Sequence, residues 1–161
     1  MTIIPATKAH FDEIVTHIAE FWGSDRTLHL HQALVIYEFG DTAYVIEDQG
    51  KVAAYLFAFI SQTEPTGYIN LIAVRDTQRN HGYGRLLYEH FMAVAEARGC
   101  TKLKAITSPT NSASIAFHRR LGMTLLGEAN ADGIPVVRDY HSPGHAMVVF
   151  SMKIADYQRP G

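Results

Sequence analysis

The sequence has little cysteine and no excess of one charge. Cys100 is the single cysteine among 161 residues, which rules out an internal disulfide framework and is compatible with a reducing compartment. The chain carries 14 Lys and Arg against 16 Asp and Glu, a formal net charge of -2. Because this balance offers no surplus of positive charge to a phosphate backbone, we expect no nucleic-acid binding.

Long apolar runs and clusters of metal ligands are also absent. Residues 1–10 contain a proline, a lysine and no continuous apolar core, which predicts neither a signal peptide nor a membrane span and hence a cytoplasmic protein. The closest histidine groups are His29-x-His31 and His141 to His145, and neither has an evident third ligand. No metal site is predicted.

The length and the 47% of hydrophobic residues are typical of one domain, residues 1–161, that buries a core without disulfides or metal. Hydrophobic periodicity and turn residues predict its elements. In chain order these are a strand at Ile3–Ile4, helices at Thr7–Trp22 and Leu28–Phe39, strands at Thr42–Glu47, Lys51–Ser61 and Tyr68–Val74, a helix at Gly84–Arg98, a strand at Lys102–Thr107, a helix at Asn111–Leu121, and strands at Met123–Glu128 and Met147–Ile154.

This order predicts an α/β (α+β) fold with helices on both faces of one mostly antiparallel sheet. The hairpin strands and Tyr68–Val74 pair antiparallel, and the helix that follows returns the chain to a parallel neighbour at Lys102–Thr107. No internal repeat or low-complexity segment interrupts the pattern.

The most informative motif is the glycine-rich turn Arg79–Arg85, which joins a predicted strand to a predicted helix. The first N–H groups of a helix lack intrahelical partners and point at one spot, which the helix dipole makes positive. Two glycines let an anion approach the backbone. The turn lacks the Lys-Ser/Thr of a P-loop and the third glycine of a Rossmann loop, which disfavours ATP hydrolysis and hydride transfer.

A second motif follows on the short helix. Asn111, Ser114 and His118 stand at i, i+3 and i+7 and therefore share one face of it. By itself such a stripe is typical of a helix surface that faces solvent.

Taken together, Arg-x-x-Gly-x-Gly at Arg79–Gly84 and Asn-Ser-Ala-Ser-Ile-Ala-Phe-His at Asn111–His118 resemble the GNAT superfamily of acyl-coenzyme A-dependent N-acetyltransferases. The order of elements is similar over nearly the whole chain. The Asn-x-x-Ser-x-x-x-His pattern resembles the phosphinothricin-type branch, which acts on small molecules. The resemblance implies a central mixed, mostly antiparallel sheet of about seven strands flanked by four helices, and acetyl-CoA as co-substrate.

The resemblance also implies the cofactor contacts. The turn would wrap the diphosphate of coenzyme A, and the main chain of Ile72 to Val74 would pair with the pantetheine arm as an added strand does. The residues implied in cofactor binding are Ile72, Ala73, Val74, Arg79, Asn80, His81, Gly82, Tyr83, Gly84, Arg85, Asn111, Ser114 and His118.

His118 is a departure from the family pattern, which most often has a tyrosine at this position. The resemblance implies a catalytic role for His118, protonation of the departing coenzyme A thiolate, and histidine can do this if burial does not depress its pKa. The alternative is that His118 only contacts the cofactor. Backbone N–H groups near Ile72 to Val74 would stabilise the developing oxyanion. Direct attack by the amine leaves no role for Cys100 as a nucleophile.

The acceptor site is less defined by the sequence. Tyr68 and Asn70 share a strand face where many relatives have a glutamate base, and neither side chain is a ready base. A water chain to Glu64, Glu38 or Asp41 is an alternative, and no base is assigned. The polar stretch 130–145 is predicted to form a long hairpin or a lid over the acceptor, with candidate contacts at Arg138, Asp139, Tyr140 and His141.

Three functions remain open at the level of sequence. The first is acetylation of a small-molecule primary amine, with Tyr68, Asn70 and Tyr140 as substrate contacts. The second is acetylation of a protein amino terminus or of an aminoacyl-tRNA, and the net charge disfavours the tRNA version. The third is a non-catalytic acyl-CoA sensor. Homodimers are common in the superfamily, but no residue here demonstrates one.

Overall fold

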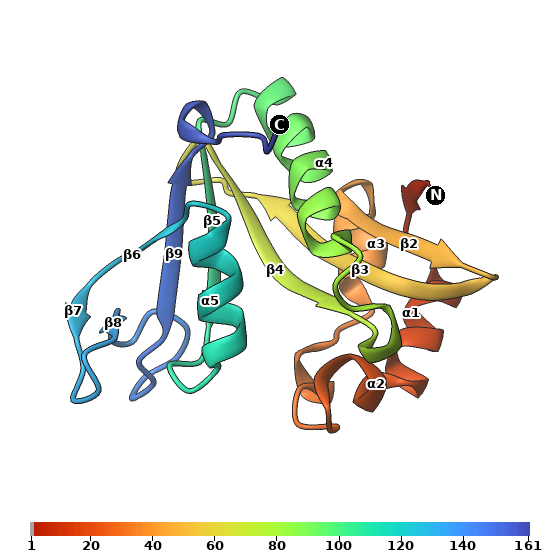
Figure 1. Ribbon diagram of the computed structural model, residues 1–161, viewed down its shortest axis with the longest axis horizontal. Helices are drawn as coiled ribbons and strands as arrows, with labels where there is room; N and C mark the ends of the chain where they lie inside the picture. Colours follow the sequence, from red (N-terminus) through yellow and green to blue (C-terminus); the bar gives the residue numbers. More distant parts are fainter. Residues whose placement is uncertain (1) are drawn as a thin grey trace. The chain divides into compact units, whose positions relative to one another are not determined.

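The structure is a computed structural model that describes residues 2–161. Its described part contains five α-helices and nine strands, together with short 3-10 turns (Figure 1). The α-helices are α1 Lys8–Thr16, α2 Ile18–Trp22, α3 Leu34–Phe39, α4 Tyr83–Ala97 and α5 Ser112–Arg120, and the strands are β1 Ile3–Pro5, β2 Ala43–Asp48, β3 Lys51–Ile60, β4 Thr66–Val74, β5 Lys102–Thr107, β6 Thr124–Leu125, β7 Glu128–Ala129, β8 Pro135–Val136 and β9 Val148–Lys153.

Seven strands form the main sheet in the order β1-β2-β3-β4-β5-β9-β6, and β7 and β8 form a separate two-stranded sheet. The pairs β1–β2, β2–β3, β5–β9 and β6–β9 are antiparallel. The predicted α+β class and the predicted neighbours β4 and β5 are confirmed.

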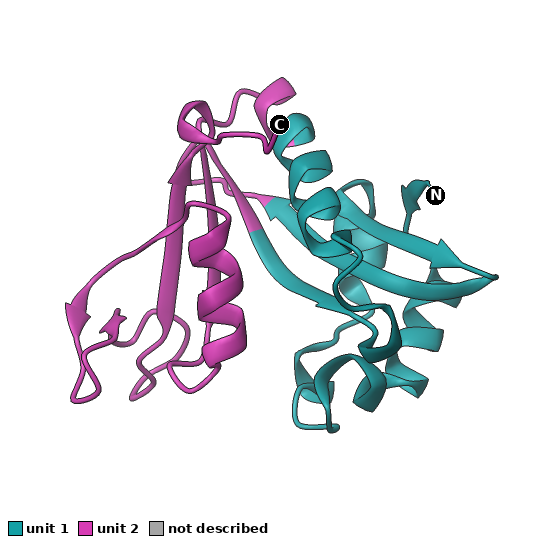
Figure 2. Ribbon diagram, in the orientation of Figure 1, with its two compact units in different colours: residues 1–59, 69–94 teal, residues 60–68, 95–161 magenta. Residues whose placement is uncertain are grey.

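The chain divides into two compact units (Figure 2). Unit 1 comprises residues 1–59 and 69–94, and unit 2 comprises residues 60–68 and 95–161. Strand β4 and helix α4 each contribute residues to both units. The single domain 1–161 stays a prediction.

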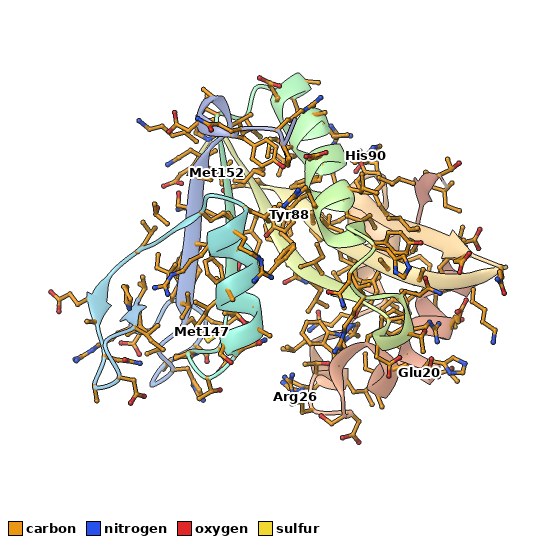
Figure 3. The ribbon with its side chains drawn as sticks, viewed as in Figure 1. Glu20, Arg26, Tyr88, His90, Met147 and Met152 are labelled. Atoms are coloured by element: carbon orange, nitrogen blue, oxygen red, sulfur yellow. The ribbon has the colours of Figure 1, made fainter. Side chains whose placement is uncertain are left out.

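In unit 1 the helices cover both faces of the sheet. Phe11 and Ile14 of α1 belong to one buried cluster with Tyr55, Phe57 and other residues of β2 to β4. On the opposite face lies α4, whose His90 is labelled in Figure 3. The ring of His90 lies 4.5 Å from that of Tyr44 on β2. The predicted hairpin is confirmed: Gln49 and Gly50 both have positive φ, as a tight two-residue turn requires.

Two predicted helices are each divided. The helix predicted at Thr7–Trp22 breaks at His17, which has φ -108 and ψ 27. Its apolar residues keep helical spacing across the break, and so periodicity could not reveal it. The helix predicted at Leu28–Phe39 is a 3-10 turn, Leu28–Leu30, followed by α3.

A tertiary contact explains the second division. The buried ring of His31 donates from Nδ1 to the Thr27 carbonyl at 2.8 Å, and its Nε2 accepts from the Tyr55 hydroxyl at 2.6 Å. The same hydroxyl accepts from Trp22 Nε1 at 2.7 Å. This buried network holds residues 27–31 in a turn instead of a continuous helix.

In unit 2, β5 and β9 pair along their length, and β6 adds two residues on the other side of β9. The strand predicted at Met123–Glu128 is also divided, into β6 and β7. Gly127 lies between them with φ 90, and a Cβ there would overlap the carbonyl of Val136 on β8. The polar stretch 130–145 contains β8, which pairs with β7 in a small two-stranded sheet. A long hairpin or lid over the acceptor stays a prediction.

Candidate functional site: a helix amino terminus and a buried histidine

Strand β4 alternates between two faces as it approaches the glycine-rich turn. Ile69, Leu71 and Ala73 are buried, whereas the residues between them are half-buried. Tyr68 and Asn70 fall in the half-buried set, as the strand period predicts. The strand ends at Val74, and the 3-10 turn Asp76–Gln78 separates it from the glycine-rich turn at Arg79.

The turn positions the amino terminus of α4 in unit 1. Asn80 and Gly82 have φ of 67 and 80, both in the left-handed region. The first helical hydrogen bond runs from the Leu86 N–H to the Gly82 carbonyl at 3.0 Å. Helix geometry therefore leaves the N–H groups of residues 83–85 without intrahelical acceptors.

This end of the helix is open to an anion. Arg79, His81, Gly82 and Arg85 are exposed, and nothing lies within 4 Å of the position that a Cβ on Gly82 would occupy. Two arginines and the helix dipole make the spot positive. The residues present therefore fit a bound diphosphate.

Contacts within unit 1 tie the turn to neighbouring elements. Arg79 Nη2 donates to the Phe21 carbonyl at 3.3 Å, and His81 Nδ1 donates to the Gln78 carbonyl at 3.0 Å. Gln78 Nε2 in turn donates to Asp48 Oδ2 at 3.0 Å. The turn is thus ordered by hydrogen bonds on the side of α2 and of the β2–β3 hairpin.

The second motif lies on α5 in unit 2. Asn111 caps the helix, because its side-chain oxygen accepts from the Ser114 N–H at 3.1 Å. His118 Nδ1 donates to the Ser114 carbonyl at 2.7 Å, and Ser114 Oγ lies 3.2 Å from the same nitrogen. The helix therefore joins the three predicted residues in one local arrangement.

His118 is buried, with 3% of its surface exposed, and its ring stacks on Phe150 at 4.1 Å between centroids and 10° between planes. Burial lowers its pKa from 6.5 to about 4, although the hydrogen bond to the Ser114 carbonyl opposes the shift. The ring is consequently neutral at pH 7, with its proton on Nδ1.

Three further residues of unit 2, Tyr68, Tyr140 and Cys100, differ in how far they are buried. Burial raises the pKa of the Tyr68 hydroxyl, and the nearby Tyr140 raises it further. Tyr140 itself is exposed, and Asp139 accepts from the Gly144 N–H at 2.7 Å. Burial also raises the pKa of the Cys100 thiol, which suits a packing role.

The structure does not support Glu64 as the general base. Hydrogen bonding to Lys104, aided by Lys102, lowers the pKa of the Glu64 carboxylate. A carboxylate with a lowered pKa is a weaker base. Glu38 is exposed on α3.

The predicted residues divide between the units. Asn70, the residues Ile72 to Val74 and the glycine-rich turn belong to unit 1, whereas Tyr68, α5 and Tyr140 belong to unit 2.

Residues 2–161 contain no group of three His, Cys, Asp or Glu side chains suited to a metal ion. Among the same residues, no helix has both the length and the apolar character needed to cross a membrane.

The sequence patterns did not single out Arg75, which follows β4 and is buried against Glu13 and Glu20. The only sequence feature that draws attention to Arg75 is its position directly after a strand, and that position does not reveal that the side chain is buried.

Comparisons with known proteins agree with this geometry. The model of the acetyltransferase (GNAT) family matches residues 11–123. L-2,4-diaminobutyric acid acetyltransferase of Nocardia farcinica (strain IFM 10152) is 30% identical over 111 residues, which span 66% of this chain and 57% of that protein.

Two solved structures share the architecture. Naa20 of Chaetomium thermophilum, in complex with a bisubstrate analogue, superposes with a TM-score of 0.74 at 18% identity, over 99% of this chain and 92% of that one. Nourseothricin acetyltransferase gives a TM-score of 0.58 at 25% identity, over 70% of this chain and 64% of that one. With the family model matching more than half of its residues, the chain belongs to the acetyltransferase (GNAT) family.

Proposed function

We propose that the protein transfers an acetyl group from acetyl-CoA to a primary amine of a small molecule, by direct attack in a ternary complex. The observation that carries the proposal is the exposed amino terminus of α4, with Gly82 in left-handed conformation and arginines on both sides of it. Bound acetyl-CoA would supply an acetyl group activated as a thioester.

Each part of the site has a role in this proposal. The amides of Arg79–Arg85 hold the diphosphate, and the main chain of Ile72–Val74 holds the pantetheine arm and stabilises negative charge on the acyl oxygen. Asn111 and Ser114 contact the cofactor. Tyr68, Asn70 and Tyr140 contact the acceptor.

A small-molecule acceptor is supported by the names of two relatives, a diaminobutyric acid acetyltransferase and a nourseothricin acetyltransferase. The Asn-x-x-Ser-x-x-x-His pattern at Asn111–His118 supports the phosphinothricin-type branch. The likeness to Naa20 concerns the fold alone. A thiol-release screen over diaminobutyrate, other amino acids, polyamines, aminoglycosides and amino-terminal peptides separates these acceptors, and release from none of them would favour an acyl-CoA sensor.

The first test compares two glycines of the same conformation at opposite ends of α4. Gly82 and Gly99 have φ of 80 and 84, and neither has an atom within 4 Å of a built Cβ. Alanine at either position costs about 1–2 kcal/mol of backbone strain. We expect Gly82→Ala to weaken acetyl-CoA binding about tenfold or more, measured by calorimetry, because the new Cβ lies at the anion-binding end.

Gly99→Ala is the matched control and should bind acetyl-CoA as tightly as the wild type. Equal losses in both variants would mean that strain alone weakens binding. A wild-type protein that neither binds acetyl-CoA nor gains thermal stability from it would contradict the proposed function.

His118 is proposed as the proton donor to the departing thiolate. Because burial lowers its pKa, the resting ring is neutral and holds only the Nδ1 proton. It would therefore first take up at Nε2 the proton that the amine loses on attack, and then pass that proton to the thiolate. His118→Phe keeps a ring to stack on Phe150 and removes the proton. We expect kcat to fall about 10²-fold, as for the loss of a general acid, with little change in the KM for acetyl-CoA. Unchanged kcat would assign His118 a contact role only.

A further inference from the structure

A buried arginine stands between β4 and the glycine-rich turn. Arg75 directly follows β4 and is 7% exposed. Its own backbone N–H donates to the Ala53 carbonyl at 2.8 Å, and its carbonyl accepts from the Gln78 N–H at 2.8 Å. The residue therefore marks the end of the sheet and caps the 3-10 turn Asp76–Gln78, which leads to the glycine-rich turn.

The guanidinium group of Arg75 binds three other elements of unit 1. Nε donates to the Val52 carbonyl on β3 at 2.8 Å, Nη2 donates to Glu13 of α1 at 2.8 Å, and Nη1 donates to the Glu20 carboxylate of α2. The centre of the Phe21 ring lies 4.8 Å from the guanidinium carbon. A buried planar fork of this kind has little rotational freedom.

The Glu13 carboxylate makes the arrangement more rigid. Its Oε1 accepts both from Arg75 and from the Val52 N–H, the latter at 2.9 Å. Glu13 therefore joins α1 to β3 and to Arg75 at the end of β4 through one oxygen atom. Truncating Arg75 would leave this carboxylate without its cation.

The Glu20 contact is more exposed to solvent. Glu20 is labelled on α2 in Figure 3, and 43% of its side chain is accessible. It lines an open hollow of about 300 Å³ together with Arg75, Asp48 and Lys51. Because water screens this pair, it should contribute less than the contact with Glu13.

Within residues 2–161, the glycine-rich turn itself makes only one direct side-chain hydrogen bond to a neighbouring helix. Residues 79–82 are exposed and include two left-handed positions, Asn80 and Gly82. The side chain of Arg79 adds one long hydrogen bond to the Phe21 carbonyl of α2. Both arginines thus fasten the turn to the same helix.

We propose that Arg75 is a positioning residue for the cofactor, which holds the amides of the Arg79–Arg85 turn in place for the diphosphate without touching the ligand. This inference rests on the proposed function. Misplacing binding groups by about 1 Å can cost up to about 10²-fold in activity, even when the change lies away from the chemistry. The role therefore predicts that a variant of Arg75 binds a ligand with the diphosphate more weakly and binds a ligand without the diphosphate as well as the wild type does.

The experiment compares Arg75→Lys with the wild type, using acetyl-CoA and S-acetylpantetheine as donors with an acceptor found in the amine screen. Lysine keeps the charge and cannot reproduce the three-way fork. We expect the KM for acetyl-CoA to rise about tenfold and kcat to change less than about twofold. With S-acetylpantetheine, which lacks the diphosphate, kcat/KM should stay within about twofold.

Hydrogen exchange in the ligand-free protein provides a readout that needs no cofactor. Arg75→Lys should speed amide exchange in residues 76–86 and leave the middle of α4, residues 87–94, unchanged. Glu20→Gln should show the same pattern more weakly, which keeps the proposal testable if Arg75→Lys does not fold. Lys8→Met is the control, because Lys8 pairs with Asp12 on the surface of α1 at 2.5 Å.

Each alternative outcome is distinct. A wild type that fails to bind coenzyme A contradicts the proposed function. A wild type that binds it, with Arg75→Lys and Glu20→Gln binding equally well, overturns the positioning role. Equal losses with acetyl-CoA and S-acetylpantetheine, or faster exchange throughout unit 1, would also overturn it, because they indicate a general structural role.

Discussion

Burial determines the chemistry of individual residues in this protein. His118 and His31 lie in different units, and desolvation lowers the pKa of both. In each case Nδ1 donates to a carbonyl four residues earlier in the chain, which fixes the neutral tautomer. The side chain thus becomes a defined hydrogen-bonding group at neutral pH instead of a cation.

The lowered pKa of His118 predicts how stability depends on pH. The folded protein keeps this ring neutral down to about pH 4, whereas the unfolded chain takes up a proton below about pH 6.5. The free energy of unfolding should therefore fall as pH decreases from 6.5 to 4, by up to about 3 kcal/mol from this residue. Urea unfolding across this range would measure the loss.

In His118→Phe the decline between pH 6.5 and 4 should be smaller, because no ring titrates at this position. His29→Phe is a control, since His29 is exposed. If His118→Phe and the wild type lost stability in parallel, His118 would not be buried as a neutral group in solution.

Elements are positioned by contacts that local sequence does not encode. Strand β7 depends on Gly127, because only a residue without Cβ leaves room for the Val136 carbonyl. The spacing of apolar residues predicted one strand through this position, and the close approach of β8 divides it. Gly127 matters for both its positive φ and this contact, and either one favours glycine.

Gly127→Ala should detach β8 from β7. The expected result is faster amide exchange at residues 128–137 and a loss of about 1–3 kcal/mol in unfolding free energy, as for other strained and overpacked sites. Gly133→Ala separates strain from overlap, because Gly133 has φ 76 and nothing within 4 Å of a built Cβ. If both variants lost the same unfolding free energy, backbone strain alone would explain the loss in Gly127→Ala.

At the scale of the whole molecule, the residues predicted to bind the cofactor divide between the two compact units. The diphosphate turn lies in unit 1, and His118 lies in unit 2, with β4 and α4 contributing to each. Most of the sheet could be predicted, because alternation along β4 and the tight Gln49–Gly50 turn are local signals. The breaks in the helices near His17 and His31 could not be predicted, because the helical spacing of apolar residues continues across them.

The sequence by itself determined the strand–turn–helix at Arg79–Arg85 and the shared helix face of Asn111, Ser114 and His118. These follow from φ preferences, capping and helical period, which act over a few residues. Only the tertiary structure decided the neutral state of His118 and the burial of Arg75 against Glu13 and Glu20. Desolvation and ion pairing depend on which residues distant in sequence pack together, and no local pattern records that.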